Sequence, residues 1–128
     1  MASVIPDELR RFLLTGTFSV PHVEAILQLR QTAPAGWNAE HLGARIYVSA
    51  SRAHDLLADL MAVGIVRAQA ENPNSYNYDP GTPELSALLD QLAKSYSEQL
   101  VSVTRLIHSA DERNARKFAA AFRFRKDT

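Results

Sequence analysis

The stretch that decides the fold reads WNAEHLGARIYVS over residues 37–49 and continues, after six further residues, as LLADLMAVGIV over residues 56–66. Asn38 and Ser49 each precede a run with apolar residues at helical spacing, and both residue types favour the capping position of a helix. Gly64 follows the second run, where glycine typically ends a helix. The stretch therefore predicts a helix over 39–46, a tight connection at Tyr47-Val48, and a second helix over 50–63.

The flanking sequence predicts further short elements. Upstream, Ser19 and Pro21 suit the start of a helix that must end before Pro34, because the residue before proline disfavours helical geometry. A shorter helix is expected over Pro6–Leu14. Downstream, a polar turn between two strand-like runs predicts a β-hairpin, with strands at Ile65–Gln69 and Ser75–Tyr78.

This order of helix, Trp37 segment, helix, tight turn, helix, glycine and hairpin resembles the winged helix-turn-helix of bacterial transcription regulators of the MarR and PadR kind, over about residues 19–80. The resemblance implies that the helix 50–63 enters the DNA major groove and that the hairpin is the wing. A long helix after the wing, used for dimerisation, also fits the PadR arrangement.

The expected fold is mainly α with a small β-hairpin: a winged helix-turn-helix head plus a long C-terminal helix. The predicted domains are the head (1–82), a dimerisation helix (83–110) and a basic amphipathic C-terminal segment (111–128). From the apolar spacing, the residues predicted to form the core of the head are Ile26, Leu27, Leu42, Ile46, Leu57, Leu60 and Val66.

From Glu84 to about His108 the pattern is helical, with apolar residues alternately four and three apart and one polar position, Gln99. Leu100 and Ile107 widen the apolar stripe, which favours a multi-helix interface in a symmetric dimer. The residues predicted to join the subunits are Leu85, Leu89, Leu92, Tyr96, Val103 and Leu106.

The segment from Arg113 to Lys126 is basic and contains no acid, with Phe118 and Phe122 one turn apart. Three interpretations stay open: a solvated end, a segment that docks on its own dimer or on a partner, or a contact with nucleic acid or an anionic membrane surface.

The start of the helix 50–63 is the candidate site. A helix N-terminus presents unpaired N–H groups and a positive dipole end, which suit phosphate. Arginine reads guanine in the major groove, and serine hydroxyls hold phosphates, so Arg52 leads the site. The predicted DNA-binding residues are Ser49, Ser51, Arg52, His54, Asp55, Arg45 and Arg67.

Charge argues in the other direction. Between Ile46 and Thr82, two arginines face four acids, which leaves a net charge of −2 where a polyanion should bind. The wing tip, residues 71–74, has no Lys or Arg. The alternative is therefore a winged-helix protein–protein interaction module without DNA binding, acting on a signalling or transcription component.

Other function classes are disfavoured by composition. The chain has 14 Lys+Arg against 14 Asp+Glu and no cysteine, so it is not basic throughout and has no disulfide or thiolate chemistry. The four histidines lack metal-ligand spacing, and no catalytic motif or cofactor signature is present. We expect no metal, no cofactor and no enzymatic activity. Without an export signal or an apolar run of about 20 residues, a cytoplasmic location is expected.

Overall fold

The computed structural model describes residues 5–14 and 18–109. By its internal contacts the chain divides into two compact units, one formed by Val20–Asp90 and the other by Met1–Ser19 together with Gln91–Thr128. The first unit begins later and ends later than the predicted head, 1–82. The basic segment 111–128 lies outside the described residues, and its role stays a prediction.

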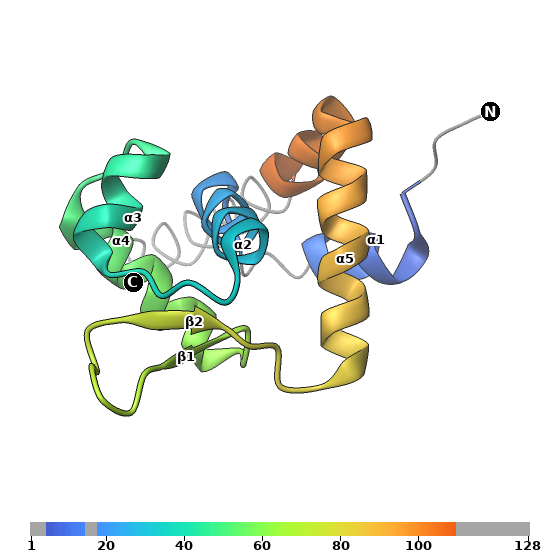
Figure 1. The fold of residues 1–128 in the computed structure, drawn as a ribbon. Helices are drawn as coiled ribbons and strands as arrows, with labels where there is room; N and C mark the ends of the chain where they lie inside the picture. Colours follow the sequence, from blue (N-terminus) through green and yellow to red (C-terminus); the bar gives the residue numbers. More distant parts are fainter. Residues whose placement is uncertain (1–4, 15–17, 110–128) are drawn as a thin grey trace, which may run out of the picture. The chain divides into compact units, whose positions relative to one another are not determined.

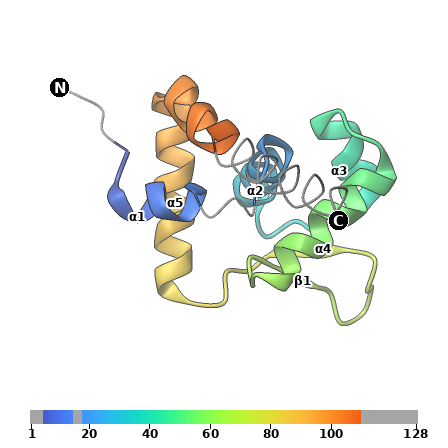
Figure 2. The same ribbon diagram turned by 180° about the vertical axis from the view of Figure 1, so that it is seen from behind.

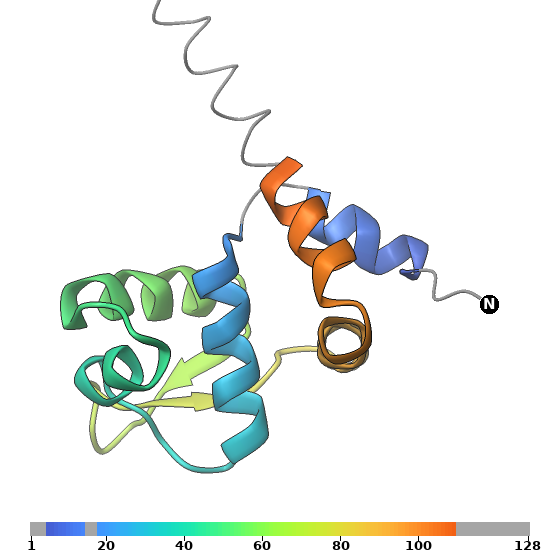
Figure 3. The same ribbon diagram turned by 90° about the horizontal axis from the view of Figure 1, so that it is seen from above.

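The unit Val20–Asp90 is a winged helix-turn-helix domain, as the sequence predicts. Three helices are followed by a two-stranded antiparallel hairpin and by the first turns of a further helix (Figure 1; from above, Figure 3). The elements are α2 (Val20–Thr32), α3 (Ala39–Ile46), α4 (Ala50–Ala62), β1 (Val66–Ala68), β2 (Tyr76–Tyr78) and α5 (Pro83–Glu98).

The local signals at the helix ends act as expected. Asn38 Oδ1 accepts a hydrogen bond from the backbone N–H of His41 at 2.7 Å. Ser49 Oγ accepts one from the N–H of Arg52 at 3.0 Å. Gly64, at φ 83°, follows α4 in the left-handed region that glycine adopts without strain. Side-chain capping therefore fixes where α3 and α4 begin.

The connection between α3 and α4 is tight because Gly43 has no side chain. A Cβ at this position would lie 2.8 Å from the carbonyl oxygen of Val48 and 3.1 Å from that of Ser49. The Gly43 carbonyl oxygen accepts hydrogen bonds from the N–H groups of Tyr47 and Val48. Tyr47 takes φ 63°, which is unusual for a bulky residue, and the chain reverses direction there.

The hairpin is tied to the end of α2 through Trp37. β1 and β2 pair with Ala68 opposite Tyr76. The Trp37 N–H donates to the Tyr76 carbonyl oxygen at 2.9 Å, and the Tyr76 N–H donates to that of Trp37 at 2.8 Å. The indole Nε1 donates to Thr32 Oγ1 at 2.8 Å. Trp37 thus pairs with β2 of the wing through its backbone and with the end of α2 through its side chain.

The core of the head contains most of the predicted residues. Fully or almost fully buried are Ile26, Leu42, Leu57, Leu60 and Val66. Leu27 and Ile46 are only half-buried, contrary to the prediction. Leu27 lies beside Ile26 at the rim of the apolar face, and Ile46 is the last residue of α3, where the chain leaves the core.

The second unit contains α1 (Asp7–Leu14) and a helical stretch over 100–109 (Figure 2). Leu9 and Leu13 of α1 are buried, as are Val103 and Ile107. α1 and the stretch 100–109 line a common hollow of about 430 Å³.

The sequence predicts one helix through the region 84–108, but the structure interrupts it. α5 ends at Glu98, Gln99 is not helical, and the helix resumes over 100–109. Serines in the last turn of α5 compete with the backbone for hydrogen bonds, which weakens a helix there. The Gln99 N–H still donates to the Ser95 carbonyl oxygen at 2.7 Å. The break is local, and apolar residues continue to be buried beyond it, at Val103 and Ile107.

The seam residues predicted for dimerisation are largely enclosed within the single chain. Fully buried are Leu89, Leu92 and Val103. Half-buried are Leu85, Tyr96 and Leu106. The exposed apolar side chains of this region are Leu100 and Val101, at 51% and 66%. The seam packs inside one chain, and its role in a dimer stays a prediction.

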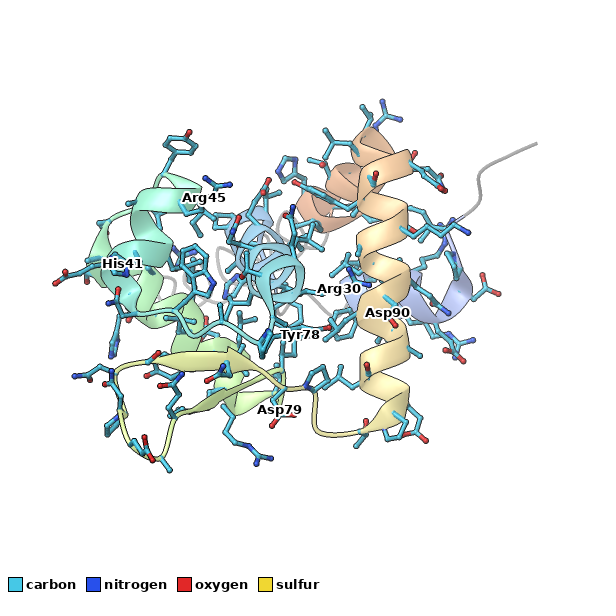
Figure 4. The ribbon with its side chains drawn as sticks, viewed as in Figure 1. Arg30, His41, Arg45, Tyr78, Asp79 and Asp90 are labelled. Carbon is cyan, nitrogen blue, oxygen red and sulfur yellow. The ribbon has the colours of Figure 1, made fainter. Side chains whose placement is uncertain are left out.

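Arg30 on α2, Asp90 on α5 and Tyr78 on β2 lie together in the unit Val20–Asp90 (Figure 4). Arg30 Nη2 and Nε donate to Asp90 Oδ1 at 2.9 and 3.1 Å. The Tyr78 hydroxyl oxygen is buried and makes no hydrogen bond among the described residues. Burial raises the pKa of Tyr78 above its usual value, and the nearby Arg30 guanidinium partly offsets that rise.

The substitution Gly43→Ala is expected to lower the free energy of unfolding by about 1–3 kcal/mol, because the added methyl group collides with backbone atoms that cannot move independently. At an unconstrained helix position the same change would stabilise by up to about 1 kcal/mol. Gly81→Ala is the control, because its Cβ would lie an ordinary 3.7 Å from the Gly64 carbonyl oxygen. Urea unfolding that shows no loss for Gly43→Ala would contradict the account of the turn.

The substitution Tyr78→Phe is expected to leave the free energy of unfolding unchanged at neutral pH or to raise it by about 1 kcal/mol, since it removes a buried hydroxyl without a partner. Because the pKa of Tyr78 is raised in the folded chain, the unfolded chain loses the hydroxyl proton at a lower pH than the folded chain does. Wild-type stability should therefore fall as the pH rises above about 10, and the variant should lose less. Urea unfolding of both proteins at about pH 7 and about pH 10.5 measures the stability difference and its pH dependence. If both proteins lose the same free energy of unfolding between these pH values, the expected effect of the Tyr78 pKa is refuted.

Candidate nucleic-acid interface

Exposed polar side chains cluster on the first turns of α4. The buried side of the helix is made by Ala53, Leu56, Leu57 and Leu60. At about 3.6 residues per turn, Ser51 and Asp55 fall in the middle of the opposite face, with Arg52 and His54 to either side. All four are exposed, as is the capping residue Ser49. The predicted residues of α4 therefore share one accessible surface.

This helix start suits an anion along its axis. The Ser49 hydroxyl satisfies the Arg52 N–H, while other N–H groups of the first turn have no partner within the helix. The helix dipole adds a partial positive charge at the same end. The Arg52 guanidinium forms no ion pair with a described acid.

A hydrogen bond between α2 and α4 holds α4 in place within the head. His22 Nε2 lies 2.7 Å from Asp59 Oδ2. His22 is 6% exposed. Nothing in the linear sequence links these two residues, and sequence reasoning missed the pair. Asp59 consequently has a structural partner and does not belong to the free acids of this surface.

A hollow of about 310 Å³ adjoins the exposed face of α4. It brings together the start of α3, the second turn of α4 and the wing, through Asn38, Ala39, Glu40, His54, Asn74 and Tyr76. Of these, only His54 was predicted as a site residue. The signal that could have found the others is Asn38, whose capping position marks the start of α3, the end of that helix that lines the hollow.

The two remaining predicted residues are engaged elsewhere. Arg45 Nε donates to Gln28 Oε1 at 3.3 Å. Arg67 Nε lies 3.4 Å from Asp79 Oδ2. Figure 4 shows Arg45 and Asp79 on opposite sides of the head, so Arg45 and Arg67 do not converge on one point. Both stay exposed, but neither joins the cluster on α4.

Side-chain contacts engage two of the four acids of residues 46–82, all of which the structure describes. Asp59 pairs with His22, and Asp79 pairs with Arg67. Asp55 has a single long contact, 4.0 Å from Oδ1 to His54 Nδ1. What faces solvent without a close partner is one cation, Arg52, and the acids Asp55 and Glu71.

Tyr47 is a further residue that sequence reasoning did not select. It is 93% exposed and stands in the turn before the α4 cap, in a left-handed conformation. An unusual backbone conformation at a bulky residue marks a position that the surrounding fold imposes. The residue type gave no signal, because glycine or asparagine would be expected there.

The order of α2, α3, α4 and a paired hairpin, with capped helices and a tight turn, defines the class of this domain as winged helix-turn-helix. In the described part of the chain, no helix is long and apolar enough to cross a membrane. Nor do three His, Asp or Glu side chains among those residues gather as a metal site requires.

Comparison with known protein families finds no family model that matches the chain, and no curated protein matches it. Among solved structures, the chain is similar to one described as a MarR family transcription regulator. The two are 23% identical, the likeness covers 94% of this chain and 80% of the other, and the TM-score is 0.48.

Proposed function

We propose that the chain is a DNA-binding transcription regulator that reads double-stranded DNA with α4. The observation that carries this proposal is the exposed, Ser49-capped start of α4, on which Arg52 has no acidic partner among the described residues. Arg52 would donate to guanine O6 and N7, and Ser49 and Ser51 would hold phosphates. The hairpin would follow the backbone as a wing, with Arg67 nearest to the DNA.

The regulator is proposed to act as a homodimer. Leu100 and Val101 present apolar side chains to solvent, and they line a hollow of about 380 Å³ with Thr104, Arg105 and His108. Exposed apolar side chains that gather on one surface favour association. A two-fold dimer would present two copies of α4 to two half-sites. This surface replaces the buried seam residues as the leading part of the proposed interface.

The second candidate is a winged-helix module that binds a protein and not DNA. It is favoured by the net charge of −2 over residues 46–82 and by the uncharged or acidic wing tip. A cytoplasmic location is part of either proposal, because both place the chain with the transcription or signalling machinery.

The substitution Arg52→Ala is expected to weaken binding to a selected duplex by roughly 1–3 kcal/mol, because a guanine contact is lost. The measurement is fluorescence anisotropy of labelled duplex against the full chain at several salt concentrations. Wild-type binding that weakens as the salt concentration rises supports the proposal, since phosphate contacts release counterions.

Arg11→Ala is the matched control for Arg52→Ala. It removes one exposed positive charge from α1, outside the unit Val20–Asp90, and should leave affinity unchanged. Equal losses in the two variants would assign the effect to overall charge and remove the role given to Arg52. No binding by the wild type at low salt would reject DNA binding and leave the protein-binding module as the better candidate.

The substitution Val101→Glu is expected to convert the proposed dimer to monomers, because a charge would enter an apolar contact. Sedimentation velocity at several concentrations measures the mass of the particle. Met61→Glu is the control, since Met61 is also an exposed large apolar residue but lies on α4. A monomeric wild type, or an unchanged mass for Val101→Glu, would contradict the proposed interface.

A further inference from the structure

Asp55 occupies an unexpected place for an acid on a helix that would face DNA. It lies in the middle of the exposed face of α4, with its side chain 68% exposed. Its contact with His54, at 4.0 Å and fully open to water, contributes little. It also lies beyond the first turn, where the helix dipole has faded. Asp55 therefore has no evident structural function in the head.

Burying this carboxylate against a duplex would be unfavourable with most sequences. The phosphates repel it, and an ionised carboxylate only accepts hydrogen bonds, so a groove edge made of acceptors leaves it without a partner. In the major groove, the exocyclic amino group of cytosine, N4, is the donor that Asp or Glu typically uses. Adenine also offers a donor, N6, but with the acceptor N7 beside it, so the cytosine edge is the one that best offsets the loss of water.

Arg52 stands one turn before Asp55 on the adjacent part of the same face. Three residues advance a helix by about 4.5 Å, close to the roughly 3.4 Å between base pairs along the duplex. With α4 lying along the groove, the two side chains would meet neighbouring base pairs. An arginine requires acceptors, as on guanine, and an aspartate requires a donor, as on cytosine.

We infer that Asp55 is a specificity-determining residue that accepts a hydrogen bond from cytosine N4 next to the guanine read by Arg52. The inference rests on the proposed function and names the ligand more closely: a duplex whose major groove presents a guanine edge and a cytosine edge at adjacent pairs. Asp55 acts mainly by exclusion, since it lowers affinity for every duplex and lowers it least where cytosine N4 is in reach.

The charge of the head fits this role. Between residues 46 and 82, Arg52 is the cation without an acidic partner, so phosphate contacts from this surface are few. Affinity for random DNA should then be low. A lysine at position 55 would strengthen binding to all sequences alike. An aspartate there, beside Arg52, instead makes the affinity depend on the base sequence.

The test selects binding sites from a pool of randomised duplexes with the full-length wild type, Asp55→Ala and Asp55→Asn, followed by sequencing. Anisotropy with a random duplex runs in parallel. Asp55→Ala should bind the random duplex several-fold more tightly and lose the cytosine preference at one position. Asp55→Asn should shift that preference to adenine, because asparagine pairs with adenine N6 and N7.

Glu71→Ala is the matched control. It removes an exposed acid from the wing tip, so it should also strengthen binding to random duplex while leaving the selected sequence unchanged. A gain in affinity alone therefore does not support the inference, and the change in base preference decides it.

Two failures are distinguishable. If the wild type selects a sequence and Asp55→Ala selects the same one with the same discrimination, or binds all sequences more weakly, the role of Asp55 is refuted while the regulator stands. If the wild type enriches no sequence and binds no duplex at low salt, the proposed function fails and the inference fails with it.

Discussion

The side chains that α4 offers to solvent depend on the close approach of the chain to Gly43. Because position 43 has no Cβ, the carbonyl oxygens of Val48 and Ser49 can lie where they would be only 2.8 and 3.1 Å from such an atom, and the turn closes with Tyr47 left-handed. Ser49 is then in place to cap α4. Capping at Ser49 fixes the first residue of α4, and Ala53 and Leu56 then lie on its buried side. The turn therefore sets which residues form the interface.

Contacts between side chains within the head determine which charged groups stay available to a binding partner. His22–Asp59 and Arg67–Asp79 each use an acid that the sequence alone would count against DNA binding. Arg67–Asp79 also engages one of the arginines that would count in favour. The Arg67–Asp79 pair, which is exposed on both sides, contributes little stability, since water screens it. The larger effect of the two contacts is on the surface potential, because they leave Arg52 and Asp55 as the charges that a neighbouring molecule meets first on α4.

Local chemistry made most of the head predictable. Asn38, Ser49 and Gly64 act through bonds and conformations confined to a few neighbouring residues, so their residue types were sufficient to place α3 and α4. The break at Gln99 was missed because apolar spacing continues through it, while the opposing preference of nearby serines is weak. His22–Asp59 joins residues far apart in sequence, and only tertiary packing brings them together. Burial of Leu89, Leu92 and Val103 likewise follows from the fold, since periodicity identifies an apolar face but not what covers it.

A head whose arginines without an acidic partner among the described residues are Arg45 and Arg52, and whose reading surface has Asp55 at its centre, would bind DNA weakly. Weak binding by one head is compatible with a regulator. Specificity is a difference between affinities, so a surface that rejects most sequences discriminates without binding any of them tightly. Two heads in one dimer contribute together, because binding of the first raises the effective concentration of the second at its half-site. Low affinity per head then becomes useful: it limits retention on random DNA, where only one head meets a favourable site. The mixed charges of α4 therefore depend on the association surface at Leu100 and Val101. A head that discriminates by exclusion yields useful affinity only when two heads bind at once.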